Sequence, residues 1–311
     1  MTEWFEVSIA PRLRLITASL LVIGLSGCAS NESISMVGEY AKQSTEVQNE
    51  LIAVYEYTDE VRINAELMKA TRDGATGADL DISTIDNEGQ ETLLKNLNTF
   101  SQSIYLLATD DRNEDLDKYS EKLNSSLVSL SQMPQMGEID VKDVELLSTS
   151  VNAIARAYTE KMRYDLLKGI VIDSESIVQS ALKSLESELD SWQEATRVSL
   201  EKELRIRLYL LNNPNRCENS DSKRCVTFYH SLEERADAYK KAYKIRVRIN
   251  ELDVKFTKLA SALVNLQELN QSIIISLKND DDLTKDAANK ALKSTKTQID
   301  AIKEFRDSLE D

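Results

Sequence analysis

The sequence predicts an all-α protein, an elongated antiparallel helical bundle with long, coiled-coil-like helices. Apolar residues recur at alternating steps of three and four along most of the chain, which is the spacing of one helix face. The 311 residues include only 8 glycines and 3 prolines, too few for the many turns of an all-β or α/β domain. No linker rich in Pro, Gly or Ser and no repeat of roughly 20–50 residues divides the chain after its N-terminal segment. We therefore expect one domain over residues 33–311, without strands.

The N-terminal segment has the order of an export signal. Arg12 and Arg14 precede an apolar run that is too short to span a bilayer, and the run ends in Leu-Ser-Gly-Cys at residues 25–28. This segment resembles the signal peptide and lipobox of bacterial lipoprotein precursors. The resemblance covers residues 1–28 and assigns no family to the helical remainder.

The resemblance implies a lipid anchor. Residues 1–27 would be removed, and Cys28 would carry several acyl chains, which anchor stably where a single chain is marginal. By the same resemblance, Ala29 favours delivery to the outer membrane. Residues 28–32 then form a short tether that holds the body close to the membrane, facing either the periplasm or the cell surface. An uncleaved apolar anchor with a chance cysteine is the alternative.

The first helix after the tether is expected to begin at Ser33 or Ser35 and to run for about 40 residues, roughly 60 Å. Its inward face consists of Val37, Ala41, Ser44, Val47, Leu51, Val54, Thr58, Val61, Ala65 and Met68. The stretch from Asp73 to Gly89 then interrupts the pattern with glycines and aspartates. We interpret it as a solvated connector. A calcium loop is the alternative, although the spacing departs from the D-x-D-x-D-G pattern.

Four more helices are expected before the cysteines. Two short ones lie around Leu93–Leu107 and Leu116–Leu130, and Pro134 ends the second. A longer one follows from Asp140 to Lys168, then a kink or turn over residues 169–176, then a helix that ends near Asn212. The inward residues of the last helix are Ile177, Ala181, Leu185, Leu189, Trp192, Thr196, Leu204 and Leu208. Trp192 is expected in the core rather than in a binding site.

Two cysteines bracket a polar turn that follows Pro214. With Cys28 acylated, Cys217 and Cys225 are the remaining thiols, and in an oxidising compartment we expect them to form a disulfide. In the chain-entropy model a ring this short stabilises by about 2–3 kcal/mol. A metal or redox pair is the alternative, but the chain has no C-x-x-C motif and no cluster of histidines.

The longest helix is expected from Thr227 to Lys278, and a turn at 279–282 separates it from a final helix. The segment of the longest helix from Arg235 to Arg248 is the cationic patch of an acidic chain. We interpret the patch as a solvated face paired with acidic neighbours rather than a lipid or polyanion site. The inward residues of the two helices are Leu232, Tyr239, Ala242, Ile249, Leu252, Phe256, Leu259, Leu263, Leu266, Ile273 and Leu277, then Ala288, Leu292, Ile299, Ile302, Phe305 and Leu309.

The sequence offers no motif for catalysis. His230 is the only histidine, so a multi-histidine zinc site is excluded, and we expect this residue to be structural or exposed. The chain contains no glycine-rich nucleotide loop and no G-x-S-x-G motif. We therefore expect no enzyme activity, cofactor or metal. The net charge of −15 argues against nucleic acid as a partner.

These features favour a lipid-anchored envelope lipoprotein that acts as a non-catalytic scaffold or protein-interaction module. It would contact the membrane through acyl chains on Cys28 and bind an envelope protein. A carrier that holds an apolar ligand or lipid between its helices is the first alternative. An enzyme with an unrecognised carboxylate site is the second. The sequence leaves the oligomeric state open.

Overall fold

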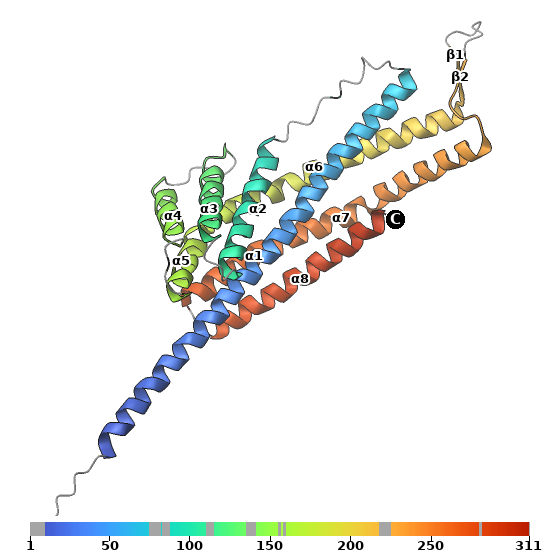
Figure 1. Ribbon diagram of the computed structural model, residues 1–311. Helices are drawn as coiled ribbons and strands as arrows, with labels where there is room; N and C mark the ends of the chain where they lie inside the picture. Colours follow the sequence, from blue (N-terminus) through green and yellow to red (C-terminus); the bar gives the residue numbers. More distant parts are fainter. Residues whose placement is uncertain are drawn as a thin grey trace, which may run out of the picture.

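The computed structural model shows an all-α bundle, as the sequence predicts (Figure 1). It describes residues 10–74, 82, 88–109, 115–134, 141–154, 157, 160–217, 225–279 and 282–310, and the side chains of these residues except 10–33, 88, 141–146, 160, 216–217, 225–226, 282–283 and 304–310. In chain order the elements are α1 (Ala10–Asp73), α2 (Glu88–Thr109), α3 (Leu116–Ser131), α4 (Val141–Ile154), α5 (Glu160–Asp173), α6 (Glu175–Asn212), β1 (Asn215–Cys217), β2 (Cys225–Thr227), α7 (Leu232–Asn279) and α8 (Asp282–Glu310).

Four long helices, α1, α6, α7 and α8, form a rod (Figure 1). Contacts between side chains fix their directions. Thr58 meets Thr196 and Glu66 meets Lys202, so α1 and α6 run parallel, toward the end that carries the β1–β2 hairpin. The helix α7 returns from that end, and α8 runs back along it. The short helices α2 to α5 lie beside the rod and bring the chain back to its starting end.

The rod contains two apolar cores. The larger core includes residues of all eight helices in the described part of the chain. A smaller core lies at the hairpin end and consists of Val61, Leu200, Leu204, Leu211, Ala238, Ala242 and Ile245. The helix α8 ends before it reaches the smaller core, so three long helices, α1, α6 and α7, build that part of the rod (Figure 1). We call this part the distal end.

Most of the inward residues expected from the sequence are buried. In α1 every one from Val37 to Ala65 is buried, and Met68 is half-buried. In α6 the set is buried from Ile177 through Leu204, with Leu208 half-buried. Regular steps of three and four keep a single face turned toward one core over many turns, so this pattern predicts burial well where a helix has only one apolar face.

Three boundaries differ from the prediction. The expected helix from Asp140 to Lys168 is two helices, α4 and α5, with Ala157 outside both and its N–H donating to the carbonyl of Ile154 at 3.0 Å. The two helices pack against each other, which one straight helix could not do, and packing outweighs propensity in short helices. The expected kink at 169–176 is a single turn residue, Ser174. The connector 75–87 lies outside the described residues except for Ile82.

The hairpin is a third departure, because no strand was expected. Its strands β1 and β2 are antiparallel, and they delay the start of α7 from the expected Thr227 to Leu232. The Oγ of Ser231 accepts a hydrogen bond from the N–H of Glu234 at 3.0 Å, which caps the first turn of α7.

Candidate interaction surface at the distal end

Cys28, which the sequence predicts to be lipidated, lies within α1. The tether expected at residues 28–32 is helical, so the chain from Cys28 to Asp73 is one continuous helix. No helix in the described residues combines the length and apolar character needed to cross a membrane.

The two cysteines of the hairpin are direct neighbours across the strands. The register places Cys217 opposite Cys225, two pairs further along than Asn215 and Thr227. The N–H of Phe228 donates to the carbonyl of Pro214 at 2.9 Å, so Pro214 and Phe228, the pair next to Asn215 and Thr227, form a hydrogen-bonded pair. Because such pairs alternate with non-hydrogen-bonded ones, the cysteines occupy a non-hydrogen-bonded position, where Cα atoms lie about 4.5 Å apart. This spacing is within the range of a disulfide, which remains a prediction.

Two other residues singled out by the sequence occupy structural positions. Trp192 is buried, and its ring packs edge to face with that of Tyr55. His230 is exposed, and its backbone N–H donates to the carboxylate of Glu234 at 2.7 Å. Among the described side chains, no group of three or more His, Cys, Asp or Glu residues is placed to hold a metal ion.

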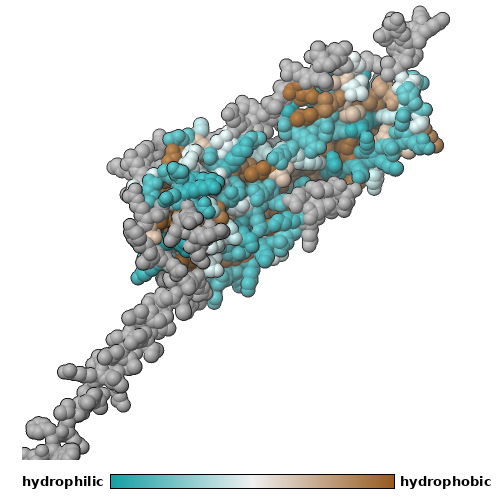
Figure 2. All heavy atoms as spheres, in the orientation of Figure 1, coloured by the Kyte–Doolittle hydropathy of each residue, from teal (hydrophilic) through white to brown (hydrophobic). Residues whose placement is uncertain are grey.

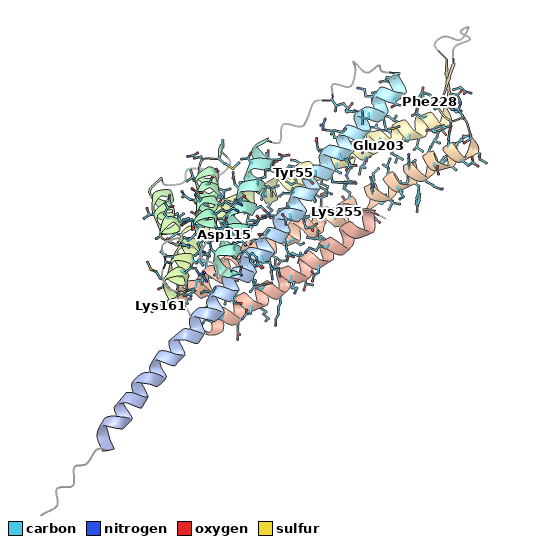
Figure 3. All side chains as sticks on the ribbon, in the orientation of Figure 1. Tyr55, Asp115, Lys161, Glu203, Phe228 and Lys255 are labelled. Carbon is cyan, nitrogen blue, oxygen red and sulfur yellow. The ribbon has the colours of Figure 1, made fainter. Side chains whose placement is uncertain are left out.

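Polar side chains of α1, α6 and α7 lie between the residues of the two cores. Figure 3 labels two polar residues of this region, Lys255 and Glu203. The hydroxyls of Thr58 and Thr196 are 2.9 Å apart, and the Nζ of buried Lys255 lies 4.8 Å from the ring centroid of Tyr57. Burial raises the pKa of Tyr57 and keeps it neutral. Toward the distal end, buried Glu203 pairs with Arg207 at 2.6 Å. Satisfied polar contacts of this kind fix the alignment of neighbouring helices.

The outer face of α7 is apolar and largely exposed. Core residues such as Ala242, Ile245 and Phe256 occupy one side of the helix. At about 100° per residue, a second set lies on the opposite side, within a strip of roughly 80°. We call this set the outer stripe: Leu232, Ala236, Tyr239, Tyr243, Val247, Asn250 and Val254. Leu232, Tyr243 and Val254 are 84%, 69% and 52% exposed, whereas Val247 is half-buried.

The outer stripe corrects the predicted inward set of α7. Leu232 and Tyr239 were expected to face inward, and both are exposed, Tyr239 by 47%. Ile249 is half-buried, whereas Ala242 and the predicted set from Leu252 to Leu277 are buried. The predicted set combined residues from two apolar faces on opposite sides of the helix. A helical projection of α7 alone would have separated them.

The outer stripe leads into a groove of about 530 Å³ on the same face of α7. The helices α6 and α8 both pack against α7 at this level and form the two walls. One wall includes Leu189, Asp190 and Gln193 of α6, and the other includes Gln298 of α8. On α7 the groove is lined by Phe256 and Asn265 together with the shorter side chains of Thr257, Ala260, Ser261 and Val264. Short residues at a helix surface allow a neighbouring backbone to approach closely.

Basic side chains flank the outer stripe. From Arg235 to Arg248, α7 carries six Lys or Arg residues and one acid, Asp237, within a chain of net charge −15. The spacing places Arg235 and Arg246 along the edge toward α6, and Lys240 and Lys244 along the opposite edge. Some of these cations have internal contacts: Lys240 lies 3.3 Å from Asp237, and Arg235 donates to the carbonyl of Leu211 at 3.3 Å. The expected pairing with acids is thus present at Lys240, but the patch keeps an excess of positive charge.

Apolar surface is also visible elsewhere at the distal end. In Figure 2 the broadest brown area lies toward the hairpin, whereas teal covers most of the body. Leu67 of α1 and Tyr209 of α6 are among the exposed large side chains there. Contiguous exposed apolar surface on a soluble body is typical of interaction sites.

Together these features define the protein as an extended helical rod with an exposed, basic-edged apolar face at one end. Comparison of the chain with protein-family models, curated proteins and solved structures finds no match.

Proposed function

We propose that this protein is a non-catalytic scaffold of the bacterial cell envelope, anchored by lipid at Cys28 and binding a partner protein through its distal end. One observation carries the proposal. Cys28 and the distal end are joined by one continuous helix, and at about 1.5 Å per residue the run from Cys28 to Asp73 spans roughly 70 Å. The protein would therefore hold the outer stripe at a fixed distance from the outer membrane.

The groove supports a binding role over storage of an apolar ligand. It lies on the outside of the bundle and opens toward solvent, between the exposed sides of α6 and α8. A carrier would instead need space between the helices. The paired positions of Cys217 and Cys225 also support the proposal, because a disulfide at the hairpin suits an oxidising compartment.

Labelling and fractionation test the anchor. The full chain is expressed in a bacterial host with radiolabelled palmitate, beside a Cys28→Ser variant. We expect label and membrane recovery for the parent and loss of both for the variant. Unlabelled protein that still partitions with the membrane through residues 1–27 would contradict a lipid anchor.

Crosslinking in intact envelopes tests the scaffold role. A photo-reactive amino acid replaces Tyr243 in the outer stripe or, as a matched control, Val198 on α6, which is 49% exposed and lies off the stripe. We expect a discrete protein adduct from position 243 and none from position 198. Equal adducts at both positions, or none at either, would contradict a binding role for this face.

A further inference from the structure

We infer that the outer face of α7 binds an α-helix whose apolar seam is flanked by acidic side chains. This inference rests on the proposed scaffold function, because it assigns the chemistry of the partner to the same face. It follows from the width of the outer stripe, from the groove that continues it, and from the charges along both edges.

The width of the stripe favours a helix as the occupant. Its seven residues are spaced by three or four and stay within roughly 80° of the α7 surface, which is the narrow seam of paired helices. A helix that packs on a broad core or lies in a membrane interface has an apolar face of about 100° or more. On α7 the basic side chains of Arg246 and Lys240 lie at the two edges of this seam.

The groove gives such a helix a defined path. From Leu232 to Val264 the face extends for roughly 50 Å, or about nine turns. Over the distal part the partner would lie on the outer stripe alone. Further along, the walls formed by α6 and α8 would hold it on both sides, above the short side chains of Thr257, Ala260 and Ser261. Helices that interlock in this manner lie about 8–10 Å apart.

The charges select the partner. Over the outer stripe, acidic side chains along the edges of the incoming helix would meet Arg235 and Arg246 on one side and Lys240 on the other. The wall of the groove carries Asp190, so the acidic flanks belong to the part of the partner that lies on the outer stripe. A second copy of this chain that pairs through the same face would bring like charges together, which is unfavourable. A polyanion such as nucleic acid would neutralise the cations but leave Leu232 and Tyr243 in water.

Two synthetic helical peptides test the assignment on the full chain in detergent micelles. Both have about 28 residues, roughly eight turns, with Leu and Ala along the seam, and they differ only in carrying Glu or Lys at the flanking positions. Binding is followed by fluorescence anisotropy. We expect the Glu peptide to bind about tenfold or more tightly than the Lys peptide, a difference that shrinks as salt rises from about 0.05 to 0.5 M.

Variants locate the site. Replacing both Tyr239 and Tyr243 by Glu is expected to weaken the Glu peptide about tenfold or more, whereas Val198→Glu, at a similarly exposed residue, leaves binding unchanged. Exchanging Lys240 and Arg246 for Glu is expected to reverse the preference toward the Lys peptide. Circular dichroism confirms that each variant keeps its helices.

Several results would overturn the inference. These are equal affinity for the two peptides, no binding of either, tighter binding to phosphatidylglycerol vesicles through Tyr239 and Tyr243, or a dimer of the parent chain that the double Glu variant dissociates. The outcomes separate this inference from the proposed function. A chain that crosslinks a partner from position 243 but ignores the Glu peptide contradicts the acidic helix alone. A chain without palmitate contradicts the anchor, whatever the peptides do.

Discussion

Two buried tyrosines of α1 provide a sharp test of the polar contacts in the main core. The hydroxyl of Tyr40 donates to the Oδ1 of Asn270 in α7 at 2.7 Å, and both residues are buried. The hydroxyl of Tyr55 is also buried but has no partner among the described residues. Replacing each tyrosine by Phe removes the same oxygen from two similar positions on one helix, so the difference between the variants isolates the hydrogen bond.

The expected changes in the free energy of unfolding depend on which buried polar groups lose a partner when each hydroxyl is removed. In Tyr40→Phe the Oδ1 of Asn270 loses its donor, and its Nδ2 already has no partner among the described residues. We expect a loss of about 1–3 kcal/mol in the free energy of unfolding, the cost of an unsatisfied buried group. In Tyr55→Phe a buried hydroxyl without a partner is removed, so the change should be near zero or stabilising by about 1 kcal/mol.

Urea unfolding at neutral pH, followed by far-ultraviolet circular dichroism, measures both changes, with unchanged m-values as the control for two-state behaviour. Equal losses in the two variants would refute the hydrogen-bond reasoning. Alkali extends the test. Burial raises the pKa of both tyrosines, so ionisation favours the unfolded chain. The buried, protonated tyrosines contribute fully to the free energy of unfolding below the unfolded pKa of about 10, and this contribution is lost as pH rises above it. Each Phe variant should therefore lose less stability in alkali than the parent.

Three further predictions concern the hairpin, an ion pair and the distal end. The two hairpin cysteines should be protected from alkylation until reduction, and replacing both Cys217 and Cys225 by Ser should cost about 2–3 kcal/mol; free thiols in the untreated protein would contradict this. Lys202 donates a hydrogen bond to Glu66 and lowers the pKa of that carboxyl, so the pair should contribute about 0.2–1 kcal/mol near neutral pH and less as pH falls below about 4. A double-mutant cycle at pH 7 and pH 3 measures this coupling, and equal values would contradict it. Backbone amides at the distal end should exchange with deuterium faster than those of the main core, because three helices enclose the smaller core there. Uniform exchange along α7 would contradict that expectation.

The sequence predicted the long helices well because each presents one uninterrupted apolar face. In α1 and α6 the steps of three and four identify the buried residues almost without error, and Trp192 lies in the core as expected. The all-α class followed from the scarcity of Gly and Pro in a chain that needs few turns. These are local signals, and the tertiary structure agrees with them.

The remaining features depend on packing that no local pattern records. Nothing in the sequence near Ala157 breaks a helix, yet α4 and α5 are separate helices that pack against each other. In α7 the pattern contains two apolar faces, and only the positions of α1, α6 and α8 decide that Ala242 is covered and Tyr243 is not. The candidate binding surface was therefore missed, because Leu232 and Tyr239 were assigned to the core and Tyr243 and Val254 to no face.

The continuity of α1 bears on how the protein would find its partner. A flexible leader lets a tethered domain sample a broad hemisphere, and its effective concentration at any one point is low. With the proposed anchor at Cys28, a helix that is unbroken from Cys28 to Asp73 would replace this diffuse search with a narrow shell at a set height. The molecule would then act as a ruler. Adding or removing one helical turn near the anchor, about 5.4 Å, would move the shell past a partner that is itself fixed in the envelope.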